Sequence, residues 1–299
     1  MATLRDIRQR ISAVKSTAKI TSAMKMVAAA KMKKAQGAIE SARPYYLKLQ
    51  EITDNLIKSV GSEYSHPLLE IREDVNRIAL MVITSDRGLC GSFNANLQKK
   101  TVRDMNVHFA KEFPGAEIDI VAIGRKACQF YPKRGYNVIE KYPGIFNTLE
   151  YEVAREILEK VRDKFLEGIY DRVFVYFNEF VSVVSQNPVF NQILPVVPES
   201  HTEQQEIDNE LAADYIFEPN KVEILDVLIP RLVNTSFWRS MLESNAAEQA
   251  ARMFAMDNAT TNAKELINHL QLVYNRERQA AITTEMLEIV SGANALKGA

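Results

Sequence analysis

The sequence predicts an α/β protein whose N- and C-terminal segments pair as a long antiparallel coiled coil, with an α/β domain inserted between them. Apolar residues repeat with heptad spacing near both ends of the chain, and residues 1–36 and 231–291 contain neither glycine nor proline. Between these ends, β-branched apolar runs alternate with helical patterns. We expect an N-terminal coiled-coil helix at 1–61, an α/β domain at 75–200 and a C-terminal helix at 212–299 that pairs with 1–61.

The N-terminal helix is predicted from its first residues onward. Thr3, followed three residues later by Asp6, resembles a weak capping box, which marks a helix start. Apolar residues then recur at alternating spacings of three and four, as in the seam of a coiled coil. These residues are Leu4, Ile7, Ile11, Val14 and Ala18.

Beyond Ala18 the apolar stripe is expected to shift, and a shift of this kind changes the local winding of a coiled coil. The shifted positions are Ile20, Met24 and Val27, with a restart at Met32. Pro44 predicts a kink, because helical spacing resumes after it. The helix is expected to stop near Gly61.

The middle of the chain is predicted to be a Rossmann-like domain. Nearly continuous apolar runs suit parallel strands that are buried on both faces: Arg77–Ser85, Glu117–Gly124 and Arg172–Phe180. Helical patterns separate these runs, so strand–helix–strand units follow: Asn94–Phe113 and Leu149–Gly168. A short strand is expected at Tyr136–Tyr142, and an edge strand at Phe190–Val197 between Pro188 and Pro198. The acidic stretch Glu199–Asp214 is expected to be a loop.

The C-terminal helix is expected to begin near Pro219, and Pro230 is a position where it can kink. No glycine or proline interrupts Arg231–Ser291. A helix of this length needs a partner along its length, and the N-terminal helix is the comparable one in the chain. The expected seam follows strict heptads: Met253, Met256, Thr260, Ala263, Ile267, Leu270 and Tyr274.

The charge of the chain is distributed unevenly. Its formal net charge is −1, yet residues 1–36 contain nine Lys or Arg residues and a single acid, Asp6. A basic arm on an acidic body predicts an anionic partner. Nucleic acid is not favoured, because no aromatic residues are interleaved with the basic ones in this arm.

Composition excludes several other classes of protein. Two cysteines and four scattered histidines argue against a disulfide scaffold and a zinc site, and favour a reducing compartment. No apolar run is long enough to cross a membrane. The N-terminus lacks the apolar core of a secretory signal. We expect neither a bound cofactor nor a metal ion.

The segment Ser85–Ser92 follows the first predicted strand, where doubly wound sheets bind phosphate. It lacks the glycine spacing of the known nucleotide motifs, so a tight turn capped by Ser92 is the favoured interpretation. Asp86 and Arg87 are expected to be an exposed contact pair on this turn, and Cys90 a buried small side chain.

Four segments together resemble one known family, in its order and at its spacing over the whole chain. They are Lys19–Met32, Ser85–Gly91, Asn245–Met256 and Leu272–Ser291. They are similar to the N-terminal helix, the central motif and the C-terminal helix of the γ subunit of F-type ATP synthase.

The resemblance implies a central rotary shaft without bond chemistry of its own. Its coiled coil would enter a ring of α and β subunits, and its α/β domain would meet the ε subunit and the membrane ring of c subunits. Membrane association would then be through the complex only, as a peripheral subunit. A starting Met without a removable presequence favours the cytoplasmic face of a bacterial inner membrane, with a mature organellar form as the alternative.

The resemblance also implies a set of residues that contact the β subunit. Met24 and Lys31 match positions in the N-terminal helix near an acidic loop of β, and Arg87 matches the arginine of the central motif. The C-terminal matches are Arg278, Gln279 and Thr283. Two other hypotheses stay open: a static coiled-coil adaptor that docks an acidic partner, and a nucleotide-binding α/β enzyme with helical arms.

Overall fold

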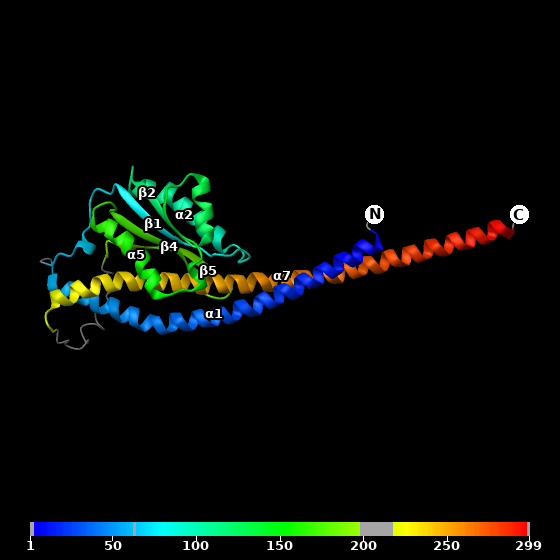
Figure 1. The fold of residues 1–299 in the computed structure, drawn as a ribbon, viewed down its shortest axis with the longest axis horizontal. Helices are drawn as coiled ribbons and strands as arrows, with labels where there is room; N and C mark the ends of the chain where they lie inside the picture. The colour runs from blue at the N-terminus through cyan, green and yellow to red at the C-terminus, as the bar shows by residue number, and fades with distance from the viewer. Residues whose placement is uncertain (1–2, 62–63, 198–217, 298–299) are drawn as a thin grey trace. The chain divides into compact units, whose positions relative to one another are not determined.

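The computed structural model of the chain describes residues 3–61, 64–197 and 218–297. Its larger elements, in chain order, are α1 (Leu4–Val60), β1 (Arg77–Ile83), α2 (Phe93–Asp104), α3 (Ala110–Glu112), β2 (Glu117–Ile123), α4 (Arg125–Phe130), β3 (Val138–Tyr142), α5 (Tyr151–Leu166), β4 (Arg172–Phe180), β5 (Gln186–Leu194) and α7 (Lys221–Lys297). Short 3-10 turns lie at Pro67–Leu69, Pro132–Arg134 and Ile145–Asn147. The expectation of long helices at both ends with a sheet domain between them is confirmed (Figure 1).

The chain divides into two compact units. One unit, which we call the sheet unit, is Ala30–Ala251. The other, which we call the helical unit, combines Met1–Ala29 with Arg252–Ala299. Both units contain parts of α1 and α7, so the three ranges expected from the sequence stay a prediction about domain limits.

The sheet has the strand order β3-β2-β1-β4-β5. Strands β1 to β4 are parallel, as the apolar runs predicted for β1, β2 and β4, whereas β5 is antiparallel to β4. The edge position of β5 is confirmed, but its predicted limits are wrong, because it starts at Gln186 and includes Pro188 opposite Asn178. An edge strand tolerates proline because one of its sides needs no ladder donor.

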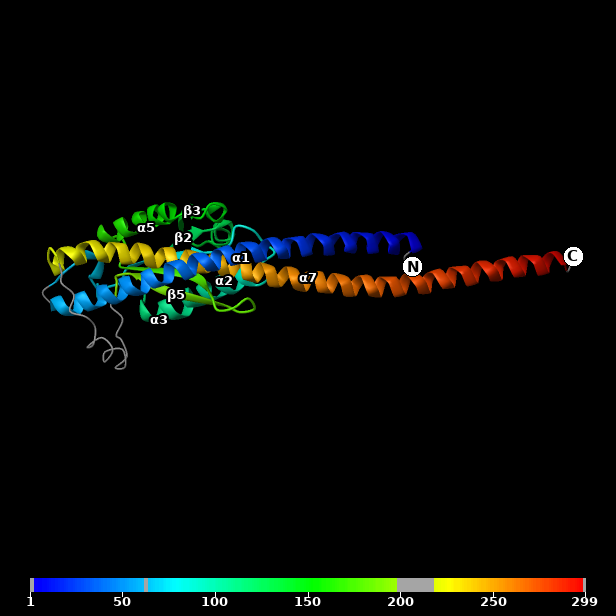
Figure 2. The same cartoon turned by 90° about the horizontal axis from the view of Figure 1, so that it is seen from below.

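Two apolar cores cover the two faces of the sheet. On one face, β1 and β4 pack against α5 and against the Leu225–Met241 segment of α7. On the other face, the strands pack against α2 and α4. Figure 2 shows α5 and α3 on opposite sides of the sheet. Burial on both faces explains why the strand sequences read as unbroken apolar runs.

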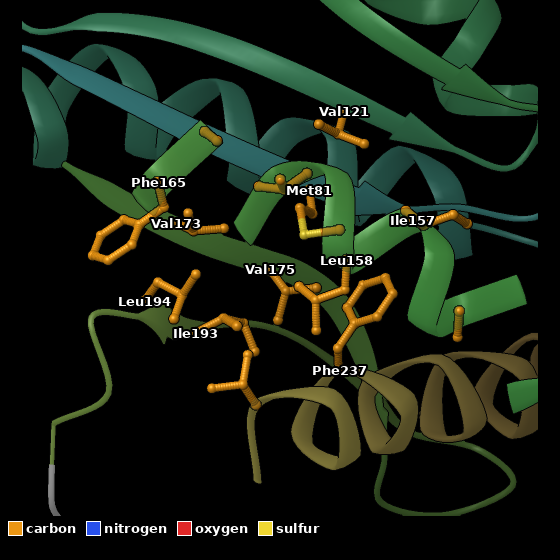
Figure 3. Packing of buried hydrophobic residues seen from close by; sticks show 14 of the residues in the cluster. Met81, Val121, Ile157, Leu158, Phe165, Val173, Val175, Ile193, Leu194 and Phe237 are labelled. Atoms are coloured by element: carbon orange, nitrogen blue, oxygen red, sulfur yellow. The ribbon is translucent and has the colours of Figure 1, made fainter. Parts of the chain in front are cut away.

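Phe237 anchors α7 in the first core. Its side chain is fully buried and reaches from the helix toward Leu158 of α5 and Val175 of β4 (Figure 3). Burial of an aromatic side chain removes a large apolar area from water, which stabilises the contact between helix and sheet. The α7 segment in this unit is therefore part of the core of the sheet domain.

The helix predicted at Asn94–Phe113 is divided into three parts. After α2 the backbone forms one stretch of π-helix at Met105–Phe109, followed by the short α3. Such bulges insert a residue into a helix and change which side chains face the core. The helix α4 was not predicted, because six residues are too few to show a period.

Helix α1 begins with the predicted capping box. The Thr3 N–H donates to Asp6 Oδ2 over 3.0 Å, and the Asp6 N–H donates to Thr3 Oγ1 over 3.2 Å. The helix continues through Pro44 and ends at Val60. Gly61 has φ +73°, a left-handed conformation that ends helices and favours glycine.

The predicted shift of the α1 stripe is wrong. Ile20 and Val27 are 59% and 57% exposed, whereas Thr21 is 9% exposed and Ala28 only 1%. These two residues continue the three-and-four spacing of Ala18, so the seam stays regular. The prediction failed because it followed apolar side chains, and here the seam carries a threonine.

Helix α7 begins two residues after the predicted Pro219. The Asn220 side chain caps it, accepting a hydrogen bond from the Glu223 N–H over 2.9 Å. The helix continues through Pro230. All seven predicted heptad residues are buried or half-buried: Met253, Met256, Thr260, Ala263, Ile267, Leu270 and Tyr274. The predicted start at 212 lies outside the described residues.

In each unit the two helices run antiparallel. In the helical unit, Arg8 Nη2 donates to the Tyr274 hydroxyl over 2.8 Å. In the sheet unit, the Tyr64 hydroxyl donates to Asp226 Oδ1 over 2.7 Å. Early residues of α1 thus pair with late residues of α7, as the antiparallel coiled coil requires.

Candidate partner-binding surfaces

Met24 lies at a polar section of the seam in the helical unit. It is half-buried and follows Thr21 by one helical turn. The hydroxyl oxygens of Thr21 and Thr260 are 2.7 Å apart. Next to Met24, the Lys25 ammonium pairs with Asp257 over 2.7 Å. These cross-helix contacts hold the helix around Met24 and leave part of its side chain accessible.

Arg278, Gln279 and Thr283 lie on α7 beyond Tyr274 and are all exposed. The Thr283 hydroxyl donates to the Gln279 carbonyl over 2.9 Å, within one turn of the helix. The three side chains therefore share a short stretch of helix surface, where they can donate and accept hydrogen bonds. The structure brings these three predicted residues together.

The same end of α7 also exposes large apolar side chains, which the sequence reasoning did not single out. They are Ile282, Met286, Leu287, Ile289 and Val290. Figures 1 and 2 both show this end of α7 continuing past the N-terminus of α1. Exposed apolar clusters of this kind mark surfaces that bind another protein. The signal was present in the sequence, since the predicted seam ends at Tyr274 while the helix pattern continues.

Lys31 and Arg87 both belong to the sheet unit, and both are exposed. Lys31 lies on α1, and Arg87 lies in the loop between β1 and α2. The other four predicted contact residues belong to the helical unit. The predicted set is thus divided between the two units.

The loop that carries Arg87 is held by a network of hydrogen bonds. Ser85 Oγ donates to the Arg87 carbonyl over 2.8 Å, and Asn94 Nδ2 donates to Ser85 Oγ over 2.7 Å. The Asn94 Oδ1 also accepts from the Ser85 N–H over 3.0 Å. Leu89 has φ +65°, which a non-glycine residue adopts only when its surroundings enforce it. The Arg87 backbone is therefore well ordered.

Asp86 does not form the predicted exposed pair with Arg87. Its side chain is buried and accepts hydrogen bonds from the backbone N–H groups of Arg125, Gly144 and Phe146. Ser92 stands at the start of α2 as predicted, but its hydroxyl does not bond to the helix backbone. Of the predicted contact pair, Arg87 is the member that is exposed.

Cys90 is buried, as predicted, and its sulfur lies near the Ser85 hydroxyl, the Asn94 amide and the Arg87 carbonyl. None of these three groups takes a proton from a thiol at neutral pH. With Phe93, this residue packs against Ala247 and Ala251 of α7. A segment of α7 thus packs against the loop after β1, on the side of the sheet where doubly wound sheets bind ligands.

The basic arm presents its charge outward. Lys15, Lys19 and Lys31 are exposed on α1, and Lys25 has an ion pair with Asp257. Exposed cations on one helix attract an acidic surface and raise the rate of association with it. The arrangement suits protein binding through charge, in both units.

Within the described ranges, none of the helices combines the length and the apolar character needed to cross a membrane.

Comparisons with known proteins agree along the full chain. A family model described as ATP synthase matches residues 3–296. The ATP synthase gamma chain of Prosthecochloris aestuarii is 49% identical over 298 residues, covering 100% of both chains. That of Chlorobaculum parvum is 48% identical over 297 residues, covering 99% of this chain and 100% of its own.

Two solved structures are similar in fold. A chain from the rotor of the mitochondrial ATP synthase of Euglena gracilis has a TM-score of 0.63 at 19% identity, with 93% of this chain and 98% of that chain covered. A chain from the central stalk and c-ring of the mitochondrial ATP synthase of Tetrahymena thermophila has a TM-score of 0.57 at 25% identity, with 80% and 99% covered.

Proposed function

We propose a function from the premise that this chain belongs to the ATP synthase gamma chain family. It is the central rotary shaft of an F-type ATP synthase and couples ion flow through the membrane sector to conformational change at catalytic sites on the β subunits. The observation that carries this proposal is the match of the whole chain to gamma chains of the same length. The paired terminal helices, with an exposed end on α7, are the form that such a shaft requires.

The chain itself performs no bond chemistry in this proposal. The ATP synthase complex makes or hydrolyses ATP, and this subunit changes the state of sites that lie on β. Cys90 is buried, and α7 packs against it and against Phe93, which supports a mechanical role. As the shaft turns, its asymmetric surface meets each β subunit in turn and favours a different conformation in each.

The partners in this proposal are the α and β subunits of the catalytic ring, the ε subunit and the c-subunit ring. The helical unit enters the catalytic ring, while the sheet unit meets ε and the c-ring. The chain is then attached to the membrane through the complex only, on the cytoplasmic face of a bacterial inner membrane. The exposed apolar side chains at the C-terminal end of α7 are evidence for a protein partner around this end, because apolar surface is unfavourable in water.

The proposed contacts with β comprise six residues. Those in the helical unit are Met24, Arg278, Gln279 and Thr283, and those in the sheet unit are Lys31 and Arg87. Arg87 is suited to a carboxylate, because its guanidinium can form two parallel hydrogen bonds. Gln279 and Thr283 offer neutral donors and acceptors instead, which suits hydrogen bonding to a loop.

Rotation separates this proposal from the static adaptor. The complex is assembled with the catalytic ring fixed to a surface and a marker attached to the sheet unit. ATP is then added, and the marker is followed by microscopy. We expect the marker to turn during ATP hydrolysis. A marker that stays still while ATP is hydrolysed would establish the adaptor in place of the shaft.

Charge at Met24 tests the contact residues. Met24→Lys places an extra positive charge beside the acidic loop of β, so we expect fewer protons pumped per ATP hydrolysed. Met26→Lys is the matched control, since Met26 is 65% exposed on the same helix and receives the same charge. Equal pumping yields in the two variants would contradict the role of Met24. The yield is measured in membrane vesicles that contain the whole complex.

A further inference from the structure

Asp86 is a buried carboxylate that takes no direct part in the proposed contacts with β. It accepts hydrogen bonds from the backbone N–H groups of Arg125 over 2.9 Å, Gly144 over 2.7 Å and Phe146 over 3.1 Å. Arg125 follows β2, while Gly144 and Phe146 follow β3. One side chain thus connects the loops after three neighbouring parallel strands.

A buried carboxylate needs such partners, because its charge is otherwise strongly disfavoured away from water. Hydrogen bonds from N–H groups to an ionised acceptor are also stronger than those to a neutral one. Asn in place of Asp would lose the charge, and its amide NH₂ would face a backbone donor. The three bonds therefore depend on the carboxylate and not merely on a side chain of this size.

Gly124 permits the close approach of these loops. It has φ +87°, and a Cβ atom at this position would lie 2.0 Å from the Thr84 carbonyl oxygen. The Thr84 Oγ1 accepts from the Ala127 N–H over 2.7 Å, which is a second tie between the same two loops. The loops after β1 and β2 are therefore tied together beside Asp86.

Arg87 is held between two anchors. Asp86 fixes its N-terminal side to the neighbouring loops, and Ser85 Oγ holds its carbonyl at 2.8 Å. Cys90 and Phe93 further along the loop pack against Ala247 and Ala251 of α7. The guanidinium of Arg87 thus stands on a backbone that is tied to the sheet and to a helix of the same unit, while its side chain is exposed.

We propose that Asp86 is a positioning residue for Arg87: by tying the loop after β1 to the loops after β2 and β3, it presents the Arg87 guanidinium to an acidic segment of the β subunit. This inference rests on the proposed contact between Arg87 and β. An ordered loop loses less freedom on binding than a mobile one, so preorganisation raises affinity without a contact of its own.

A double-mutant cycle tests the proposal in the full-length chain. The affinity for an assembled ring of α and β subunits is measured for Asp86→Asn, Arg87→Ala and both together. We expect each single variant to bind about tenfold more weakly, which corresponds to about 1.4 kcal/mol. The double variant should bind no more weakly than Arg87→Ala alone, because Asp86 acts through Arg87. An additive loss of about a hundredfold would overturn the proposal.

Asp163→Asn is the matched control, since it removes the same charge from an exposed site on α5. Its affinity should equal that of the unmodified chain. Ser85→Ala is a second variant that disturbs the position of Arg87. It is measured in addition if the thermal unfolding curve shows that Asp86→Asn does not fold. It removes the hydroxyl that holds the Arg87 carbonyl and leaves the three bonds to Asp86 in place. It should show the same non-additivity with Arg87→Ala.

The outcomes of these measurements distinguish a failure of this inference from a failure of the proposed function on which it rests. If Arg87→Ala binds as tightly as the unmodified chain, the proposed contact between Arg87 and β is wrong. If Arg87→Ala weakens binding while folded Asp86→Asn and Ser85→Ala do not, the contact stands and the positioning role is wrong.

Discussion

The two units of this chain bury their side chains in different ways. In the sheet unit, whole strands such as β1 and β2 are covered on both faces, and two cores form around them. In the helical unit, each helix buries only a single row of residues, and the remaining faces are exposed. Because two helices alone cannot cover all of their sides, this unit offers most of its surface to water or to partners.

The difference also separates two kinds of binding residue. Arg87 stands on a loop held by buried hydrogen bonds, so its surroundings are ordered before any partner arrives. Arg278, Gln279 and Thr283 stand on a helix end whose described side chains are exposed. Local opening costs least where few apolar contacts hold a segment. We therefore expect partners to order the end of α7 and to find the Arg87 loop already formed.

Loss of a core aromatic side chain in the sheet unit should lower the free energy of unfolding more than the other substitutions below. Phe237→Ala leaves a cavity between α7 and the sheet, and we expect a loss of about 3–5 kcal/mol in the free energy of unfolding. Fluorescence of the single tryptophan, Trp238, during urea unfolding reports on this unit. Leu47→Ala, at a 54% exposed position of α1 in the same unit, is the control and should change stability by about 0.5 kcal/mol or less. Equal losses in both would contradict the description of this core.

The seam of the helical unit should tolerate a similar truncation better. Leu270→Ala removes a buried seam residue, and we expect a loss of about 2 kcal/mol, because water can reach the site from the side. Leu272→Ala is the control, since Leu272 is 70% exposed two residues away. Amide hydrogen exchange along α7 measures the local free energy of opening. A larger loss than for Phe237→Ala would reverse the comparison between the units.

The threonine pair tests the polar section of the seam. Thr21→Val leaves the Thr260 hydroxyl without its partner across the helices, and we expect a loss of about 1 kcal/mol. Thr260 keeps a hydrogen bond to the Met256 carbonyl, which limits the effect. Changing both residues to Val should restore the stability, because no polar group then lacks its partner. Hydrogen exchange would refute this account if the double variant were less stable than the single one.

A small pH effect should be confined to the sheet unit. The His66 ring accepts from the Leu68 N–H through Nδ1 over 3.1 Å. Burial lowers the pKa of His66 below its usual 6.5, while nearby Asp226 acts weakly in the opposite direction. The unfolded chain then takes up this proton first as the pH falls. The contribution of His66 is present above pH 6.5 and declines as the pH falls through the range just below it.

His66→Asn should remove this part of the pH dependence. Asparagine can accept the same hydrogen bond and does not titrate. Thermal unfolding of the full chain at pH 7.5 and 5.5 compares the two proteins, and the unmodified chain should lose more stability on acidification. An equal loss in both would show that His66 does not contribute.

Local patterns in the sequence were sufficient to predict the helices and strands, but not the burial of every side chain. Heptad spacing located the seam of α7 from Met253 to Tyr274, and the apolar runs located three of the parallel strands, β1, β2 and β4. The same reasoning placed Asp86 on the surface, because a charged residue in a turn is usually solvated. It passed over Thr21 for the same reason, since polarity was taken as a sign of exposure.

The sequence by itself determined where helices and strands form, because the 3.6- and two-residue periods are written in neighbouring residues. It also determined the basic charge of the first arm and the family motifs. Only the tertiary structure decided the strand order, the antiparallel β5 and the partners of Asp86. Those partners stand 39 to 60 residues away in the chain. No local period reports on a hydrogen bond across that separation, so only the folded chain shows why Arg87 is exposed and Asp86 is not.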